Sequence, residues 1–223
     1  MNKLTRSTLL AFLLIFTGCA AQTSLEPLGK GNTHANVGFG GPIIEVFGTH
    51  LPVPYLTAGV VTGVSERVNG AATLHLLPLA YEVAGLDLST SWFPILQEQR
   101  KPTIGLQARL MGFVSLRSGI GDRFRIYPMV TPTLAWRKGS RLYYGGSDLV
   151  LPMTLPDYDS QSVKAIFSPF LGVKWRLGSN LWLSTEMKWQ GANAQSDQLA
   201  VKYLPVAGHG AISTLVALEW GLR

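Results

Sequence analysis

Four histidines are the residues of this chain best suited to acid–base chemistry. They are His34, His50, His75 and His209. A hydrolase would need one of them within hydrogen-bond reach of a nucleophile and an acid. Ser213 follows His209 by four residues, which in an extended strand puts both side chains on one face but about 13 Å apart. No histidine stands beside a nucleophile in a recognisable motif, so we expect no enzymatic activity and no catalytic residue.

The same residue types do not predict a metal or cofactor site. Four histidines and one cysteine show none of the short spacings that hold a zinc ion. Gly38-Phe39-Gly40-Gly41 is glycine-rich, but no helix is predicted after it to bind a phosphate. We therefore expect neither a metal nor a cofactor, and interpret these glycines as positions of strand bending or close packing.

The single cysteine is the residue for which a covalent modification is expected. Cys19 follows a basic stretch with Lys3 and Arg6 and then an apolar stretch over 9–16. This order is typical of a secretory signal, and the apolar stretch is too short for a membrane-spanning helix. As the only cysteine, Cys19 has no intrachain disulfide partner.

Phe16-Thr17-Gly18-Cys19 resembles the lipobox of bacterial lipoproteins, in which a peptidase cuts before the cysteine and the thiol carries diacylglycerol. The resemblance implies a signal peptide over 1–18 and a lipidated Cys19 at the mature N-terminus. Ala20 in the next position implies sorting to the outer membrane. The alternative is an ordinary cleaved signal with an incidental cysteine. Residues 19–32 are then the lipidated cysteine and a polar, flexible tether.

The elements that must position any site are strands. From about His34 onward, apolar and polar residues alternate between Gly, Pro and Asn, the pattern of half-buried strands, and no convincing amphipathic helix is found. About ten strands are predicted, at roughly 33–41, 55–67, 71–80, 85–93, 103–116, 123–137, 141–149, 164–177, 181–191 and 209–222. Pro128 and Pro132 each remove a ladder donor, so a bulge or irregularity is expected there.

The connections between the predicted strands alternate in length. Tight turns are expected at 68–70, 138–140 and 177–180, and long connections at 42–54, 150–163 and 192–208. The tight turns follow even-numbered strands and the long connections follow odd-numbered ones, a bias typical of outer-membrane barrels. Two connections depart from this alternation: 118–121 is short where a long loop is expected, and 94–102 is longer than a tight turn.

Tryptophans are predicted to mark one level of the barrel. Four of them lie on the apolar face near the ends of even-numbered strands: Trp92, Trp136, Trp175 and Trp220. An amphipathic indole ring suits the membrane interface, so we predict an aromatic girdle on the periplasmic side. The alternative is a set of core tryptophans in a soluble sandwich.

Charged residues alternate with the apolar stripe and are predicted to line the lumen. The candidate network is Asp87, Arg109, Arg125, Lys174, Glu186, Lys188 and Glu219. A barrel of about ten strands is narrow and filled by its own side chains, and buried charges need partners. We expect Asp87 to pair with Arg109, and Glu219 to meet Glu186 or Lys188.

The composition favours a membrane barrel. Hydrophobic residues make up 47% of the 223 residues and charged residues 14%, against about 25% charged in an ordinary soluble domain. No apolar run after the N-terminus is long enough for a spanning helix. The net charge of +6 is scattered singly, so no nucleic-acid partner is expected.

Taken together, the chain resembles bacterial outer-membrane β-barrel proteins that carry a lipoprotein signal. The resemblance implies an all-β fold: a closed, antiparallel, up-and-down barrel of about ten strands over 33–223. It also implies a lipid-anchored place in the cell outer membrane and a structural or small-ligand/transport role. The implied partners are membrane lipid, the barrel-assembly machinery and the lipoprotein-sorting machinery. The chain departs from the pattern because it ends Leu222-Arg223 and not in an aromatic residue.

Two other functions remain open from the sequence. One is a lipid-anchored but soluble periplasmic β-sandwich or lipocalin-like binding protein, whose apolar face points inward. The other is a barrel hydrolase that acts on lipid.

Overall fold

The computed structural model describes residues 24–46, 49–52, 55–99, 101–117, 124–151, 165–196 and 204–222. The predicted signal peptide and Cys19 lie outside these residues. The strands are β1 (Thr33–Val46), β2 (Thr49–Pro52), β3 (Tyr55–Ser65), β4 (Val68–His75), β5 (Val83–Ile95), β6 (Thr103–Ser115), β7 (Phe124–Lys138), β8 (Arg141–Val150), β9 (Ile166–Arg176), β10 (Leu181–Gln195) and β11 (His209–Leu222), and a short 3-10 helix, η1 (Leu77–Tyr81), joins β4 to β5. Over the described part of the chain, no helix has the length and apolar character needed to cross a membrane.

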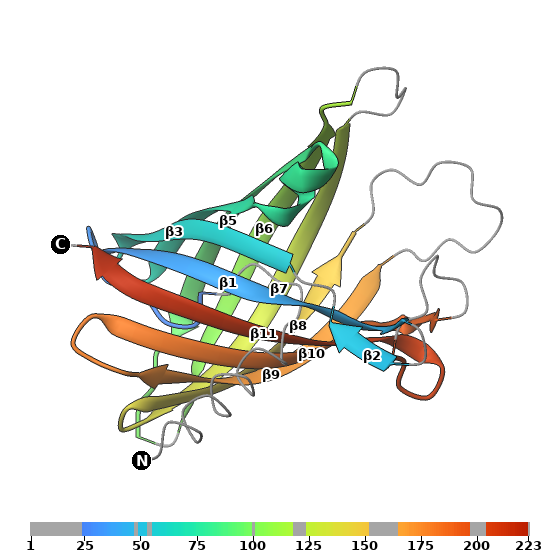
Figure 1. Ribbon diagram of the computed structural model, residues 1–223. Helices are drawn as coiled ribbons and strands as arrows, with labels where there is room; N and C mark the ends of the chain where they lie inside the picture. The colour runs from blue at the N-terminus through green and yellow to red at the C-terminus, as the bar shows by residue number, and fades with distance from the viewer. Residues whose placement is uncertain are drawn as a thin grey trace, which may run out of the picture.

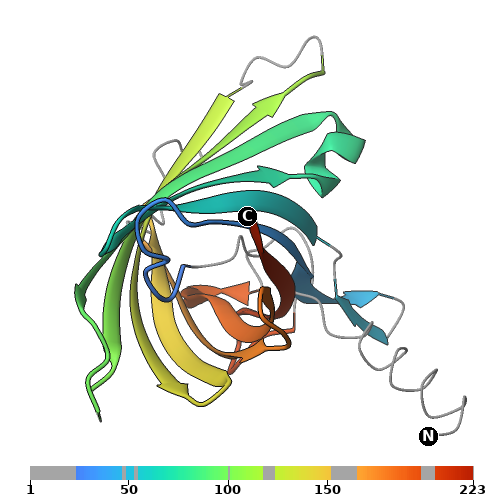
Figure 2. The ribbon, with the colours of Figure 1, turned by 90° about the vertical axis from the view of Figure 1, so that its left-hand side faces the viewer.

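The strands close into a barrel (Figure 1). Each strand from β3 to β10 pairs with the strand that follows it in the chain, and β1 pairs with β3. β1 also pairs with β11, from Thr33↔Leu222 to Pro42↔Ser213. This last pairing removes the free edge that an open sheet would expose. The short β2 pairs with the far part of β1 and projects from the wall, so ten of the eleven strands form the barrel (Figure 2). The predicted closed antiparallel barrel is confirmed.

The connections divide the barrel into two ends. The short-turn end carries the turns at 66–67, 139–140 and 177–180 together with the connection at 96–102. The long-loop end carries the connections that follow β2, β4, β6, β8 and β10. Leu222, which pairs with Thr33, lies at the short-turn end, and so does Ser24, which is hydrogen-bonded to Asn69. The segments expected as connections at 118–121, 150–163 and 192–208 lie wholly or partly outside the described residues.

The stretch from Val68 to Tyr81 differs from the prediction. A tight turn was expected at 68–70 and a strand over 71–80, whereas β4 begins at Val68, ends at His75 and is followed by η1. Pro78 lies in the first turn of η1, where its fixed φ suits a helix and its missing N–H cannot serve a ladder. Glu82, with φ 59° in the left-handed region, ends the helix and turns the chain into β5.

Strand β7 keeps its register through two prolines. Its pairing with β6 runs without a shift past Pro128 and Pro132. Its pairing with β8 is interrupted between Val130 and Thr133 and resumes in the same register. The expected irregularity is a local break in the β7–β8 ladder beside Pro132, without a bulge or a change of register.

The burial pattern is inverted relative to a soluble protein. Large apolar side chains point outward and are exposed, among them Leu74, Leu86, Leu88, Leu106, Leu110, Leu134, Leu171 and Leu218. Polar side chains point inward and are buried, among them Asn69, Ser91, Gln107, Thr131, Thr133, Ser184 and Ser213. Successive residues of a strand face opposite sides of the sheet. The alternation of apolar and polar residues in the sequence therefore produces an apolar outer wall and a polar lumen.

Candidate functional site in the lumen

Five charged side chains form a central cluster across the lumen: Asp87, Arg109, Asp148, Glu186 and Lys188, each no more than 5% exposed. Lys188 lies between two carboxylates, with Nζ 2.6 Å from Asp148 Oδ2 and 3.4 Å from Glu186 Oε1. The hydroxyl of Thr131 donates a hydrogen bond of 2.7 Å to the other oxygen of Asp148.

The second half of the central cluster is organised by Arg109 on β6. Its Nε lies 3.4 Å from Asp87 Oδ2, and its Nη2 donates to Gln107 Oε1 at 2.9 Å. Gln107 in turn donates from Nε2 to Ser89 Oγ at 3.1 Å. The structure thus brings Asp87 and Arg109 together on neighbouring strands, as the alternation of β5 and β6 leads one to expect.

The central cluster separates two cavities. Removing charges from water is costly unless each finds partners. The hydrogen bonds and ion pairs above link β5 to β6 and join β7, β8 and β10 to one another. The arrangement places ion-paired side chains across the middle of the lumen. Chemically, it can hold the strands in register and block passage.

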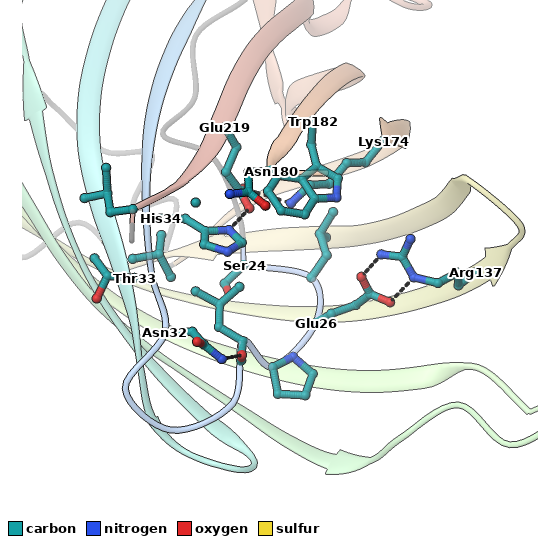
Figure 3. A pocket seen from close by; sticks show the side chains of 16 residues that line it. Ser24, Glu26, Asn32, Thr33, His34, Arg137, Lys174, Asn180, Trp182 and Glu219 are labelled. Atoms are coloured by element: carbon teal, nitrogen blue, oxygen red, sulfur yellow. Dashed lines mark hydrogen bonds and ion pairs between the residues drawn. The ribbon is translucent and has the colours of Figure 1, made fainter. Parts of the chain in front are cut away.

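The first cavity, the short-turn cavity, has a volume of about 500 Å³ (Figure 3). On its wall His34 Nδ1 lies 2.7 Å from Glu219 Oε1, and Lys174 Nζ lies 2.8 Å from Glu219 Oε2. The ring of His34 stacks on Trp182, with centroids 4.8 Å apart and an interplanar angle of 22°. The ammonium of Lys174 lies 5.7 Å from the centroid of the same indole ring, within the range of a cation–π contact.

The pairing of His34 with Glu219 resembles the base and orienting acid of a hydrolase, but a nucleophile is also required. Within the described residues, no hydrogen bond joins the second ring nitrogen of His34 to a hydroxyl. The contacts of His34 are those of a residue held in place by an acid and an aromatic ring. The absence of catalysis stays a prediction.

Residues 24–28 enter the short-turn end of the barrel. Leu25, 4% exposed, packs in a cluster with the inward side chains Ala135, Leu142, Tyr144 and Phe170. The amide of Asn69 donates to Ser24 Oγ at 2.7 Å and to the backbone oxygen of Glu26 at 2.9 Å.

Two further contacts fix this N-terminal segment. Arg137 Nε donates to Glu26 Oε1 at 2.9 Å, and Nη2 of the same guanidinium pairs with the other carboxylate oxygen, a bidentate geometry visible in Figure 3. Gly31 N donates to Gly63 O and Gly63 N donates to Asn32 O, both at 2.8 Å. The expectation of a free tether is therefore wrong for residues 24–32, because they bond to the barrel wall.

The second cavity, the long-loop chamber, has a volume of about 380 Å³. Arg109, Asp148 and Lys188 of the central cluster form its floor, and Tyr55, at the start of β3, belongs to its wall. The chamber lies between the central cluster and the loops at that end of the barrel.

The predicted lumen residues fall into two groups and one outlier. Asp87, Arg109, Glu186 and Lys188 belong to the central cluster, whereas Lys174 and Glu219 pair in the short-turn cavity. The expected meeting of Glu219 with Glu186 or Lys188 is wrong, since the register of β10 with β11 aligns Glu219 with Trp182 and Glu186 with Leu215.

Arg125 is the outlier of the predicted network. It lies near the long-loop end of β7, is exposed, and forms no ion pair within the described part of the chain. Arg125 lies on the inward-facing side of β7, but this is not enough to bury it. The first residues of β7 extend beyond the central cluster toward the long-loop end.

The four tryptophans of the predicted girdle lie on the outer face toward the short-turn end. Trp92, Trp136 and Trp220 are 51%, 41% and 38% exposed, and Trp175 is partly exposed. Trp189 faces outward nearer the long-loop end and donates from Nε1 to the backbone oxygen of His209 at 2.9 Å.

Several lumen residues were missed from the sequence. Asp148 occupies an inward position of a predicted strand, so the alternation could have identified it. His34 and Trp182 also lie at inward positions, but their contact depends on the pairing of β1, β10 and β11 around the closure. Glu26 precedes every strand and carries no periodic signal. Over the described residues, no group of three or more His, Cys, Asp or Glu could hold a metal ion.

Comparison with known proteins gives likeness in fold at low similarity. No protein-family model matches the chain, and no curated protein matches it. Similar solved structures include the translocator domain of autotransporter NalP from Neisseria meningitidis (11% identity, 88% of this chain and 90% of that chain, TM-score 0.45). The NanC porin is also similar (9% identity, 85% of this chain and 100% of that chain, TM-score 0.46). So is the outer membrane protease OmpT from Escherichia coli (11% identity, 90% of this chain and 99% of that chain, TM-score 0.42). Identities and TM-scores this low carry no argument about what the chain binds or does.

Proposed function

We propose that this protein is an outer-membrane β-barrel lipoprotein with a sealed lumen, a structural or small-ligand role and no enzymatic activity. The observation that carries the proposal is the orientation of the wall. Apolar side chains such as Leu171, 60% exposed, cover the outside, whereas the charges of the central cluster are buried inside.

The outer wall suits a bilayer better than water. Soluble monomers rarely expose continuous apolar patches larger than a few hundred Å², and here such side chains occur on the outer face of strand after strand. In hydrocarbon every backbone polar group needs a partner within the protein, which the closure between β1 and β11 supplies along the wall. A soluble lipocalin-like barrel would place its apolar side chains inside, which is the reverse of this arrangement.

The proposed lipid anchor is compatible with the position of the N-terminal segment. Cys19 precedes Ser24 by five residues, and that length of extended chain reaches at most about 17 Å. A diacylglycerol on Cys19 would therefore stay near the short-turn mouth, where Ser24 and Glu26 are held. In the proposed orientation the short-turn end, with Ser24, Leu222 and the tryptophan girdle, faces the periplasm, and the long-loop end faces the outside of the cell.

Carbonate or urea washing of membranes tests the proposal. The Cys19→Ala variant is expected to remain in the membrane pellet because the wall itself is embedded, and to lose labelling by a radioactive fatty acid. Wild type and Cys19→Ser, which also lacks a thiol, are the matched controls. Release of Cys19→Ala into the wash would contradict the embedded barrel. Fatty-acid labelling that persists in both variants would contradict the anchor alone.

A further inference from the structure

The long-loop chamber has a wall made of aromatic rings. Tyr55 and His75 contact edge to face with centroids 5.4 Å apart, His75 and Phe113 lie 5.0 Å apart, and Phe113 and Tyr127 lie 6.1 Å apart. These four residues come from β3, β4, β6 and β7, so the rings form a continuous row around one side of the chamber. Such spacings favour further edge-to-face or stacked contacts with an aromatic guest.

Methionine and aliphatic side chains complete the walls. Met111 and Met129 line the chamber beside Phe113 and Tyr127, and Val150 and Ile166 line it from β8 and β9. Thioethers are polarizable and contact aromatic rings favourably. The volume of about 380 Å³ falls in the lower part of the range of small-molecule sites, which is roughly 300–1,000 Å³.

The charged side chains at the floor of the chamber are already engaged in ion pairs within the central cluster. Lys188 reaches it already bonded to Asp148 and close to Glu186, and Arg109 reaches it beside Asp87. Each of the three carboxylates and two cations of the central cluster thus lies in an ion pair with another member of the cluster. A charged guest would have to leave water without a counter-ion of its own, at a cost of several kcal/mol by the usual order of magnitude.

We propose that the long-loop chamber is a binding site for small, uncharged aromatic molecules that enter from the long-loop end. The site deepens the small-ligand role in the proposed function and rests on the orientation given there. Tyr55 begins β3, Val150 ends β8 and Ile166 begins β9, so the chamber opens toward the loops. The central cluster beneath it keeps the guest from passing on to the short-turn cavity.

The chain carries reporters for this site. Met111 and Met129 line the chamber, whereas Met187 lies 48% exposed on the outer wall. The test is an NMR titration of the mature chain, labelled with methyl-¹³C methionine and placed in bilayer discs of deuterated lipid. Indole is the added ligand, and methionine-to-leucine substitutions assign the methyl signals. The methyl signals of Met111 and Met129 are expected to shift along a saturable curve because of ring currents. The signal of Met187 is expected to shift only linearly, as indole partitions into the bilayer.

A blocking variant and its control locate the site. Met111→Trp fills the chamber and should abolish the saturable shift of Met129, while Met187→Trp on the outer wall should leave it unchanged. Benzoate and benzylammonium, charged rings of similar size, should bind at least tenfold more weakly than indole.

Three results overturn the inference: unsaturable shifts at Met111 and Met129 in the wild type, equal behaviour of the two tryptophan variants, or tight binding of either charged ring. The first of these results is read from the titration of the wild-type chain alone, so it does not depend on whether Met111→Trp folds. Retention of the same chain in washed membranes is measured beforehand. A retained chain without saturable shifts overturns the binding site alone, whereas a chain lost from the membrane overturns the proposed function.

Discussion

Replacing Lys188 tests whether the central cluster holds the barrel together. Lys188→Met keeps the length of the side chain but removes the cation that lies 2.6 Å from Asp148 and 3.4 Å from Glu186. Both carboxylates are then buried without their nearest positive charge, and breaking a buried pair in this way costs about 3–5 kcal/mol. Folded domains are stable by only about 5–15 kcal/mol, so a large fall in the free energy of unfolding is expected.

The measurement is urea unfolding in lipid, followed by tryptophan fluorescence and by heat-modifiable migration. Asp148→Asn and the double variant complete a cycle, in which a coupling free energy of about 2 kcal/mol is expected between the two positions. Arg117→Met is the matched control. This change breaks the ion pair between Arg117 and Glu82, whose side chains are 67% and 58% exposed respectively. Exposed ion pairs contribute at most about 1 kcal/mol to stability. A loss for Lys188→Met no greater than that of the control would refute a structural role for the central cluster.

Three further predictions concern the N-terminal segment and the lumen. Glu26→Arg or Arg137→Glu alone should increase hydrogen exchange at residues 24–32, and the two changes together should restore protection, because the bidentate pair is reversed and not lost. Gly63→Ala should also release this segment, since a Cβ there overlaps the backbone oxygen of Gly29, whereas Gly70→Ala, whose nearest neighbour would be 3.5 Å away, should not. In planar bilayers the wild-type chain should show no steady conductance; sustained open channels would show that the lumen is not sealed.

The barrel could be predicted from the sequence because its signals are local. Alternation with a period of two, as in 212–222, depends on neighbouring residues alone, and the parity of turn lengths survives errors of a few residues at each boundary. The strand predicted over 71–80 is too long because the apolar residues after His75 also suit a strand, whereas Pro78 lacks the N–H that a ladder needs and lies in η1.

The lumen was predictable in position but not in partnership. That Glu219 and Lys188 point inward follows from alternation, but which charges meet depends on the stagger between strands, which no local pattern reports. The β10–β11 register sets Glu219 opposite Trp182, so it pairs with Lys174 and His34. The contact of Glu26 with Arg137 joins residues 111 positions apart, and the segment around Glu26 carries no strand pattern at all.

Quenching of single tryptophans by brominated lipid tests most directly whether the apolar wall faces acyl chains. In variants that keep one tryptophan and replace the others by phenylalanine, Trp220 on the outer wall should be quenched strongly by lipids brominated near the headgroup. Trp182, stacked on His34 inside the short-turn cavity, should keep its fluorescence. Equal quenching of both, or a Trp220 that brominated lipid leaves untouched, would contradict the membrane orientation on which the proposed function depends.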